Sequence, residues 1–221
     1  RESSPSRGLG DVYKRQVHHM GREDQSHAQA RAMIDAWWPE TKEGGGQGLD
    51  AIVINASGCG TTVKDYGFMF RNDPAYADKA AIVSALAKDV SEVLADVGLT
   101  EAVVETGQRV TYHAACSLQH GQRVRSQPKE LLEKAGFDVK EAAEGHLCCG
   151  SAGTYNMLQP EIATRLRDRK MANIAVTAPE IIAAGNIGCI TQIASAGNIP
   201  VVHTVELLDW ATGGPKPANL N

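Results

Sequence analysis

Two adjacent cysteines followed by a glycine stand out in the stretch GHLCCGSAG, residues 145–153. A disulfide between Cys148 and Cys149 would strain the peptide that joins them. The remaining cysteines are Cys59, Cys116 and Cys189, which makes five in 221 residues. An odd number fits poorly with a framework of disulfides. We therefore expect reduced cysteines that bind a metal or carry out redox chemistry.

The spacing of four of these cysteines favours an iron–sulfur site. Thirty-one residues separate Cys116 from Cys148, and 39 separate Cys149 from Cys189. Thiolates select zinc, copper(I) or iron–sulfur clusters, but the sequence lacks the paired C-x2–4-C knuckles typical of zinc sites. Adjacent cysteines are badly placed to clasp one ion, yet they can reach different irons of one cluster. The alternative is that all four are small buried core residues.

The elements that must position these cysteines alternate between strand and helix. Apolar runs and turn residues predict the following segments. We expect strands at 51–55, 108–116, 137–142, 179–186 and 199–204, and helices at 24–38, 74–97 (one long or two short), 126–136, 159–175, 188–197 and 205–211, with a solvated basic face at 165–170 and a loose tail at 213–221.

This alternation predicts an α/β fold with mostly parallel sheets and helices on their faces. In such sheets, ligands gather at the carboxyl ends of the strands. Cys59, Cys116 and Cys189 each follow a predicted strand, and Cys148 and Cys149 lie on a loop before a helix. We therefore expect one edge of the fold to collect the thiols.

An internal repeat indicates two tandem Rossmann-like units. AIVINASGCGTTV (51–63) aligns with IIAAGNIGCITQI (181–193), and RAMIDAW (31–37) aligns with RKMANIA (169–175), in the same order and at similar offsets. We expect residues 17–100 to form the C-terminal part of a first, incomplete unit and 106–212 to form the second. Cys59 would then be the surviving cofactor-binding thiol of the first copy.

The first sixteen residues, RESSPSRGLGDVYKRQ, look foreign. DVYKRQ can be encoded by GAT-GTG-TAT-AAG-AGA-CAG, which resembles a transposase end sequence used in shotgun libraries. We interpret residues 1–16 as a translated sequencing adapter, with a natural disordered leader as the alternative. On the first interpretation, the natural protein is longer at its N-terminus.

The composition argues against some classes of partner. The chain is 43% hydrophobic and 22% charged, with a net charge of −4. This balance gives no basic groove for nucleic acid, and no apolar run reaches the length of a bilayer span. We expect a cytoplasmic, reducing setting. His113, His120 and His146 flank the cysteines, either as ligands or proton acceptors or merely as hydrogen-bonded loop residues.

Several stretches resemble the cysteine-rich "CCG" domain. They are HAACSLQH, HLCCGSAGTYN, GNIGCITQIASAG and VVHTVELLDW, together with NASGCGTTVKDYG in the first copy. This domain family includes one component of heterodisulfide reductase, lactate-utilisation iron–sulfur proteins and the glycolate oxidase iron–sulfur subunit, and the wording here is most similar to the last. The resemblance spans roughly residues 17–212.

The resemblance implies an electron-transfer subunit. Such a subunit takes electrons from flavin subunits that oxidise glycolate and passes them toward a membrane quinone, as a cytoplasmic protein peripheral to the inner membrane. It holds no FAD itself and is not catalytic alone. The resemblance assigns cluster binding to Cys116, Cys148, Cys149 and Cys189. The two ferredoxin-like [4Fe–4S] motifs of the family would lie upstream, because no C-x2-C-x2-C run occurs here.

One departure from the family pattern leaves alternatives open. The heterodisulfide reductase pattern ends in C-x-x-C, which supplies a fifth thiol, whereas this chain has Gln192 at that position and Thr62 in the first copy. Four thiolates still suffice for a [4Fe–4S] or simpler cluster. The alternatives are a heterodisulfide-reductase-like or lactate-utilisation protein, and a non-catalytic docking scaffold with a degenerate site.

Overall fold

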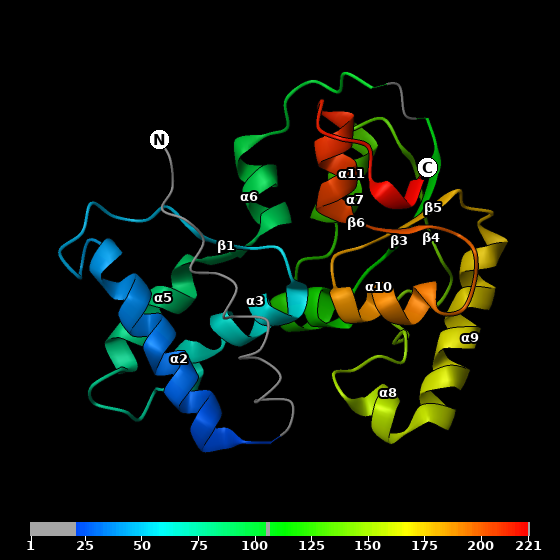
Figure 1. Ribbon diagram of the computed structural model, residues 1–221. Helices are drawn as coiled ribbons and strands as arrows, with labels where there is room; N and C mark the ends of the chain where they lie inside the picture. The colour runs from blue at the N-terminus through cyan, green and yellow to red at the C-terminus, as the bar shows by residue number, and fades with distance from the viewer. Residues whose placement is uncertain (1–20, 105–106, 221) are drawn as a thin grey trace. The chain divides into compact units, whose positions relative to one another are not determined.

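The computed structural model describes residues 21–104 and 107–220, so the stretch interpreted as an adapter lies outside the described part. The chain forms two compact units (Figure 1). The first contains the described residues up to Ile54 together with Cys59–Lys88. The second contains Asn55–Gly58 and the described residues from Asp89 onward. No helix among the described residues is long and apolar enough to cross a bilayer.

The first unit is mainly helical around a small core. Its elements are α2 (Glu23–Trp37), η2 (Trp38–Glu40), β1 (Ile52–Ile54), α3 (Ser57–Lys64), α4 (Tyr66–Met69), α5 (Ala77–Leu86) and β2 (Ala87–Asp89). Ala30 and Ile34, four residues apart on one face of α2, pack into the same cluster as Phe70 and Val83. The core therefore depends on the helical stripe that the sequence predicts for α2.

One expectation for this region was wrong. The apolar run 51–55 predicts a buried strand, but Val53 of β1 is 53% exposed. Among the described residues, β1 pairs with β2 alone, in a two-stranded sheet rather than in a larger parallel sheet between helical layers. Of the two possibilities for 74–97, the structure has two short helices, α5 and α6, because Ala87 is extended and Asp89 caps a new helix.

The second unit is built on a four-stranded parallel sheet. Its strands are β3 (Arg109–His113), β4 (Asp138–Glu141), β5 (Ile181–Ala184) and β6 (Val201–His203), in the order β4-β3-β5-β6. Its helices are α6 (Val90–Val97), η3 (Ser117–Gln122), α7 (Gln127–Lys134), α8 (Tyr155–Leu158), α9 (Pro160–Val176), α10 (Ile187–Ala194), α11 (Thr204–Ala211) and η4 (Ala218–Leu220). The prediction of an α/β fold with parallel strands is confirmed.

Helices cover both faces of this sheet (Figure 1). On β5, Ile181 and Ala183 point into a cluster that also contains Leu131 of α7 and Leu207 of α11. The intervening Ile182 joins a second cluster with residues of α9 and α10. All four residues of β5 are buried, as expected for a central parallel strand. The second cluster also contains Cys149 and Cys189, so the site rests on one side of this core.

The local repeat seen in the sequence is present as a strand–helix pair in each sequence copy. β1 ends at Ile54 and α3 spans Ser57–Lys64, while β5 ends at Ala184 and α10 spans Ile187–Ala194. Each of these bounds recurs 130 residues later, so Cys59 and Cys189 are both the third residue of their helix. The domain limits 17–100 and 106–212 stay predictions.

The C-terminal segment is not a loose tail. Pro217 is buried, and the side-chain amide of Asn219 donates to the carbonyl of Val201 at 3.3 Å. Leu220 packs against the core under α7 and α11. Its polar composition hid these contacts with the sheet.

The N-terminus of α6 gives a test of this local structure. The buried carboxylate of Asp89 accepts hydrogen bonds from the backbone N–H (2.9 Å) and hydroxyl (2.6 Å) of Ser91, and Glu92 completes a capping box. We expect Asp89→Ala to lower the free energy of unfolding by about 1–2 kcal/mol, measured by urea denaturation. Replacing exposed Glu101 by Ala should change it by less than about 0.5 kcal/mol. Equal effects from the two substitutions would contradict the capping role.

Candidate metal centre

The carboxyl edge of the second sheet brings four cysteines to one place. Cys116 precedes η3 just beyond β3, Cys148 and Cys149 lie in the loop after β4, and Cys189 lies in the first turn of α10 after β5. From β3 the chain crosses to β4 on one side, and from β5 it crosses to β6 on the other. The sheet order therefore reverses between β3 and β5, which is where α/β sheets place their ligands.

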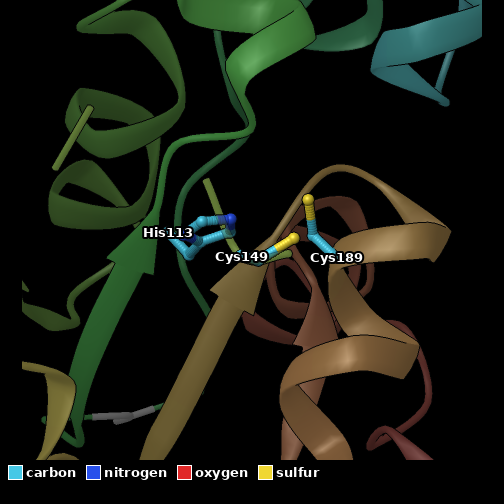
Figure 2. A group of neighbouring side chains, drawn as sticks. All are labelled: His113, Cys149 and Cys189. Atoms are coloured by element: carbon cyan, nitrogen blue, oxygen red, sulfur yellow. The ribbon is translucent and has the colours of Figure 1, made fainter. Parts of the chain in front are cut away.

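Three potential ligand atoms lie especially close together at this point. A ring nitrogen of His113 and the sulfurs of Cys149 and Cys189 all lie within 4.8 Å of one another, and all three residues are buried. Figure 2 shows His113 at the end of β3 and Cys189 at the start of α10, with the Cys149 side chain between them. This group is arranged as the ligands of one metal ion would be.

The other two thiols extend this group in a chain. Side-chain interactions connect Cys116 with Cys148, Cys148 with Cys149, and Cys149 with Cys189. All four are free cysteines, and their exposure rises from buried Cys149 and Cys189 to exposed Cys116. The structure therefore brings together the four cysteines that the sequence singled out, although their role as ligands stays a prediction.

The four sulfurs strongly perturb one another's ionisation. Interaction with the thiols of Cys116 and Cys149, together with the Gly150 N–H 3.3 Å from its sulfur, lowers the pKa of Cys148. Interaction with Cys149, and then with the imidazole of His113, lowers the pKa of Cys189 to about 5. The same contacts raise the pKa of Cys116 and Cys149. The site thus holds thiolates beside thiols, and a metal would displace the remaining protons.

The first turn of α10 fixes Cys189. The side-chain oxygen of Asn186 caps the helix by accepting the N–H of Gly188 at 2.9 Å and that of Cys189 at 3.3 Å. A helix N-terminus also favours a nearby negative charge. A β-carbon at Gly188 would meet the Ser151 hydroxyl at 2.7 Å, so this glycine lets the CCG loop approach the helix.

The glycine of the CCG motif has a similar steric role. Gly150 has φ +92°, and a β-carbon there would lie 2.3 Å from the carbonyl oxygen of Ala163 on α9. Both the backbone conformation and the space therefore require glycine. This close packing against α9 fixes the position of the loop that carries Cys148 and Cys149.

Helix α9 clamps the start of the cysteine loop. Arg169 forms an ion pair with the Glu144 carboxylate, which also accepts from Asn173 at 2.8 Å. Lys170 reaches the main chain instead, and its ammonium donates to the carbonyls of Glu144 (3.0 Å) and Gly145 (3.4 Å). Lys170 is only 1% exposed, so the expectation that the whole basic run 165–170 is a solvated face was wrong.

Lys170 also supplies a buried positive charge close to the cysteines. Burial lowers its pKa, while the nearby side chains of Cys149, Cys148, Glu144 and Cys189 act in the opposite direction without cancelling that effect. Buried cations are costly unless anions or acceptors surround them. The carbonyls of Glu144 and Gly145 are such acceptors, and the lowered pKa of Cys148 and Cys189 favours anionic sulfurs nearby. Sequence reasoning missed Lys170, because its neighbours Arg165 and Arg169 are exposed as predicted.

The segment Asn55–Gly58 supports the site through Ser57. Its hydroxyl is hydrogen-bonded to that of Ser117 (2.8 Å) and accepts from the Asn186 amide (3.0 Å). Its carbonyl accepts from Gln122 at 2.6 Å, and its N–H donates to the carbonyl of Gly185. Ser57 thus ties η3, which follows Cys116, to the cap of α10. The sequence around Ser57 gave no signal from which this role could be predicted.

Gln192 and Cys59 are two further residues that the sequence analysis singled out. Gln192, at the position of the family's fifth thiol, is nearly buried, and its side-chain oxygen accepts from Asn156 of α8 at 3.1 Å. Cys59 belongs to the first unit, where it is partly exposed in the first turn of α3. Its assignment as a cofactor ligand stays a prediction.

The residues present fit a thiolate-bound metal or cluster. Soft sulfur donors converge, and Nε2 of His113 is buried with no hydrogen-bond partner among the described residues. Buried polar atoms are normally paired, so an unpaired nitrogen on an imidazole that lies beside two sulfurs fits a metal site. His120 and His146 are exposed instead. The sequence did offer a signal for His113, which ends a buried strand three residues before Cys116.

The fold and site together define a cysteine-rich α/β domain, and comparison with known families agrees. Residues 110–194 match the family model described as the CCG cysteine-rich domain.

Whole-chain comparisons identify similar proteins. The chain is 41% identical over 194 residues to the glycolate oxidase iron–sulfur subunit of Escherichia coli, covering 88% of this chain and 47% of that protein. It is 33% identical over 175 residues to a probable glycolate oxidase iron–sulfur subunit of Bacillus subtilis, covering 75% and 39%. It is 29% identical to lactate utilization protein A of Oceanobacillus iheyensis, covering 71% and 68%. The chain thus spans about half the length, or less, of the first two relatives.

The anchoring of the cysteine loop by Lys170 can be tested by hydrogen exchange. Lys170→Met removes the donor to two loop carbonyls, and a hydrogen bond to a charged group contributes about 1.5–3 kcal/mol. We expect amides of residues 145–150 to exchange at least about tenfold faster, measured by mass spectrometry. Arg165→Met makes the same chemical change on the exposed face of α9 and should leave these rates unchanged. Unaltered exchange in Lys170→Met would contradict the anchoring role.

Proposed function

We propose that this chain is part of an iron–sulfur electron-transfer subunit of a glycolate oxidase (glycolate dehydrogenase) complex. The observation that carries the proposal is the gathering of Cys116, Cys148, Cys149 and Cys189 at the carboxyl edge of one sheet. The 41% identity to a protein named as such a subunit supports the particular complex. These four residues would hold the cluster, which would supply one-electron redox chemistry when bound.

The graded exposure of the site suits electron transfer. Cys149 and Cys189 are enclosed by the apolar core, whereas Cys116 reaches the surface. A cluster held here would be shielded by protein on one side and within reach of a partner on the other. Exposed apolar side chains at Met157, Leu158 and Ile187 lie on α8 and α10, which also border the site, and such residues are typical of surfaces that partners cover.

The partners and location follow from the same proposal. Flavin subunits would carry the FAD and oxidise glycolate, so we assign no catalytic residue to this chain. Electrons would continue toward the membrane quinone pool, with the subunit at the cytoplasmic face of the inner membrane. Lactate is the second candidate substrate of the complex, since lactate utilization proteins A are also similar to the chain.

The number of thiol ligands distinguishes the main proposal from the heterodisulfide-reductase alternative. Four thiolates support a [4Fe–4S] cluster, whereas the heterodisulfide-reductase pattern requires a thiol where Gln192 stands. The Gln192 side chain is held by Asn156, which favours electron transfer over thiol–disulfide catalysis. A docking scaffold without a cluster is the remaining alternative.

Anaerobic reconstitution with iron and sulfide tests whether the four cysteines bind a cluster. We expect iron and sulfide to load the chain and reduction to give an EPR signal. Cys189→Ser should lower bound iron several-fold, because it removes a buried soft ligand. Cys59→Ser alters a cysteine of the first unit and should leave the signal of the four-cysteine site in place. A wild-type chain that binds no iron would favour the docking scaffold.

The electron-transfer role requires a second experiment. The reconstituted chain is mixed anaerobically with purified flavin subunits of a glycolate oxidase and then with glycolate. We expect co-purification of the subunits and reduction of the cluster, followed by EPR, only when flavin subunits and glycolate are both present. Replacing glycolate by lactate compares the two substrates. A loaded cluster that stays oxidised with both would contradict the proposed relay while leaving cluster binding intact.

A further inference from the structure

His113 is a buried side chain for which the four-cysteine site offers no role. It is the last residue of β3 and is 4% exposed. Its Nε2 has no hydrogen-bond partner among residues 21–104 and 107–220. Leaving a buried polar atom unpaired costs roughly 1–3 kcal/mol. The imidazole interacts with the Cys189 side chain, but its Nε2 is left with the capacity to bind a metal.

The geometry indicates what kind of partner this is. A ring nitrogen of His113 lies within 4.8 Å of the sulfurs of both Cys149 and Cys189. Donors that bind one tetrahedral metal at about 2.0–2.3 Å are separated by about 3.5 Å, so small adjustments would let these three share a metal. Figure 2 shows the imidazole at the end of β3, the Cys149 sulfur beside it and Cys189 at the start of α10.

Gln192 occupies the position from which a fifth thiol would reach the site. It lies three residues after Cys189, and residues at this spacing share a helix face. A thiol here would therefore project toward the same side as Cys189. The Gln192 oxygen is instead occupied by the Asn156 amide, and the side chain is nearly buried. The site thus lacks the fifth thiol, while His113 approaches it from β3.

We propose that His113 binds iron through its imidazole nitrogen as a fifth protein ligand, beside Cys116, Cys148, Cys149 and Cys189. This inference rests on the proposed iron–sulfur function. A neutral imidazole donates a lone pair and forms an iron–nitrogen bond without a change of oxidation state. Imidazole in place of thiolate also removes one negative charge from the cluster. Histidine ligation is known to raise the potential of iron–sulfur clusters for this reason.

Pulsed EPR on the reconstituted full chain tests the inference directly. Electron spin echo envelope modulation of the reduced cluster should show strong coupling to a bound imidazole nitrogen. When histidine is labelled with nitrogen-15, the coupling to nitrogen-14 should be replaced by coupling to nitrogen-15. The coupling should disappear in His113→Cys and persist in His120→Ala, whose histidine is exposed on η3. A loaded wild-type cluster without this coupling overturns the inference but not the proposed function. A wild-type chain with no cluster overturns both.

A rescue experiment keeps the test independent of any folding defect. We expect His113→Ala to lower bound iron at least twofold while the circular dichroism spectrum is retained. The double variant His113→Ala with Gln192→Cys should recover iron binding, because it restores a fifth donor at the other position, but it should lack the nitrogen coupling. If His113→Ala alone binds iron with an unchanged EPR spectrum and potential, the proposed ligation is wrong.

Discussion

The site depends on one constraint, namely that parallel strands end at the same edge of their sheet. β3, β4 and β5 run in one direction with aligned register, so the segments that follow them are brought together by main-chain hydrogen bonds. No contact between the cysteines is needed to achieve this. The reversal of strand order between β3 and β5 then opens room at that edge for a ligand. Packing around the sheet only has to adjust the height and direction of each sulfur.

Those adjustments come from steric fit on one side and charge on the other. The loop packs closely against α9 at Gly150, and Ser151 packs closely against α10 at Gly188. Neither position therefore has space for a side chain. Lys170 places a cation under the same loop, where neighbouring cysteines offset part of the effect of burial on its pKa. A group of neighbouring thiolates would repel one another without such compensation. The N-terminus of α10 at Cys189 also stabilises negative charge on the sulfurs.

Much of this arrangement could be predicted from sequence, because it rests on local patterns. Apolar runs located the four strands of the second sheet, and the spacing of Cys116, Cys148, Cys149 and Cys189 indicated convergence. What the sequence did not reveal depends on tertiary contacts. Lys170 looks like its exposed neighbours until the loop carbonyls are placed over it. Ser57 is an ordinary serine whose partners are 60 to 129 residues away. β2 is three residues long and was hidden between two helices.

The distribution of burial also separates the two kinds of chemistry open to a cysteine cluster. Thiol–disulfide catalysis needs a thiolate that substrate sulfur can approach directly. Cys149 and Cys189 are enclosed among apolar side chains. Cys116 is exposed, but its pKa is raised by Cys148, which makes it a poor nucleophile without a metal. An electron needs only proximity and no open path for atoms. A site that encloses two sulfurs, leaves Cys148 partly exposed and reaches the surface through Cys116 therefore suits the carrying of electrons.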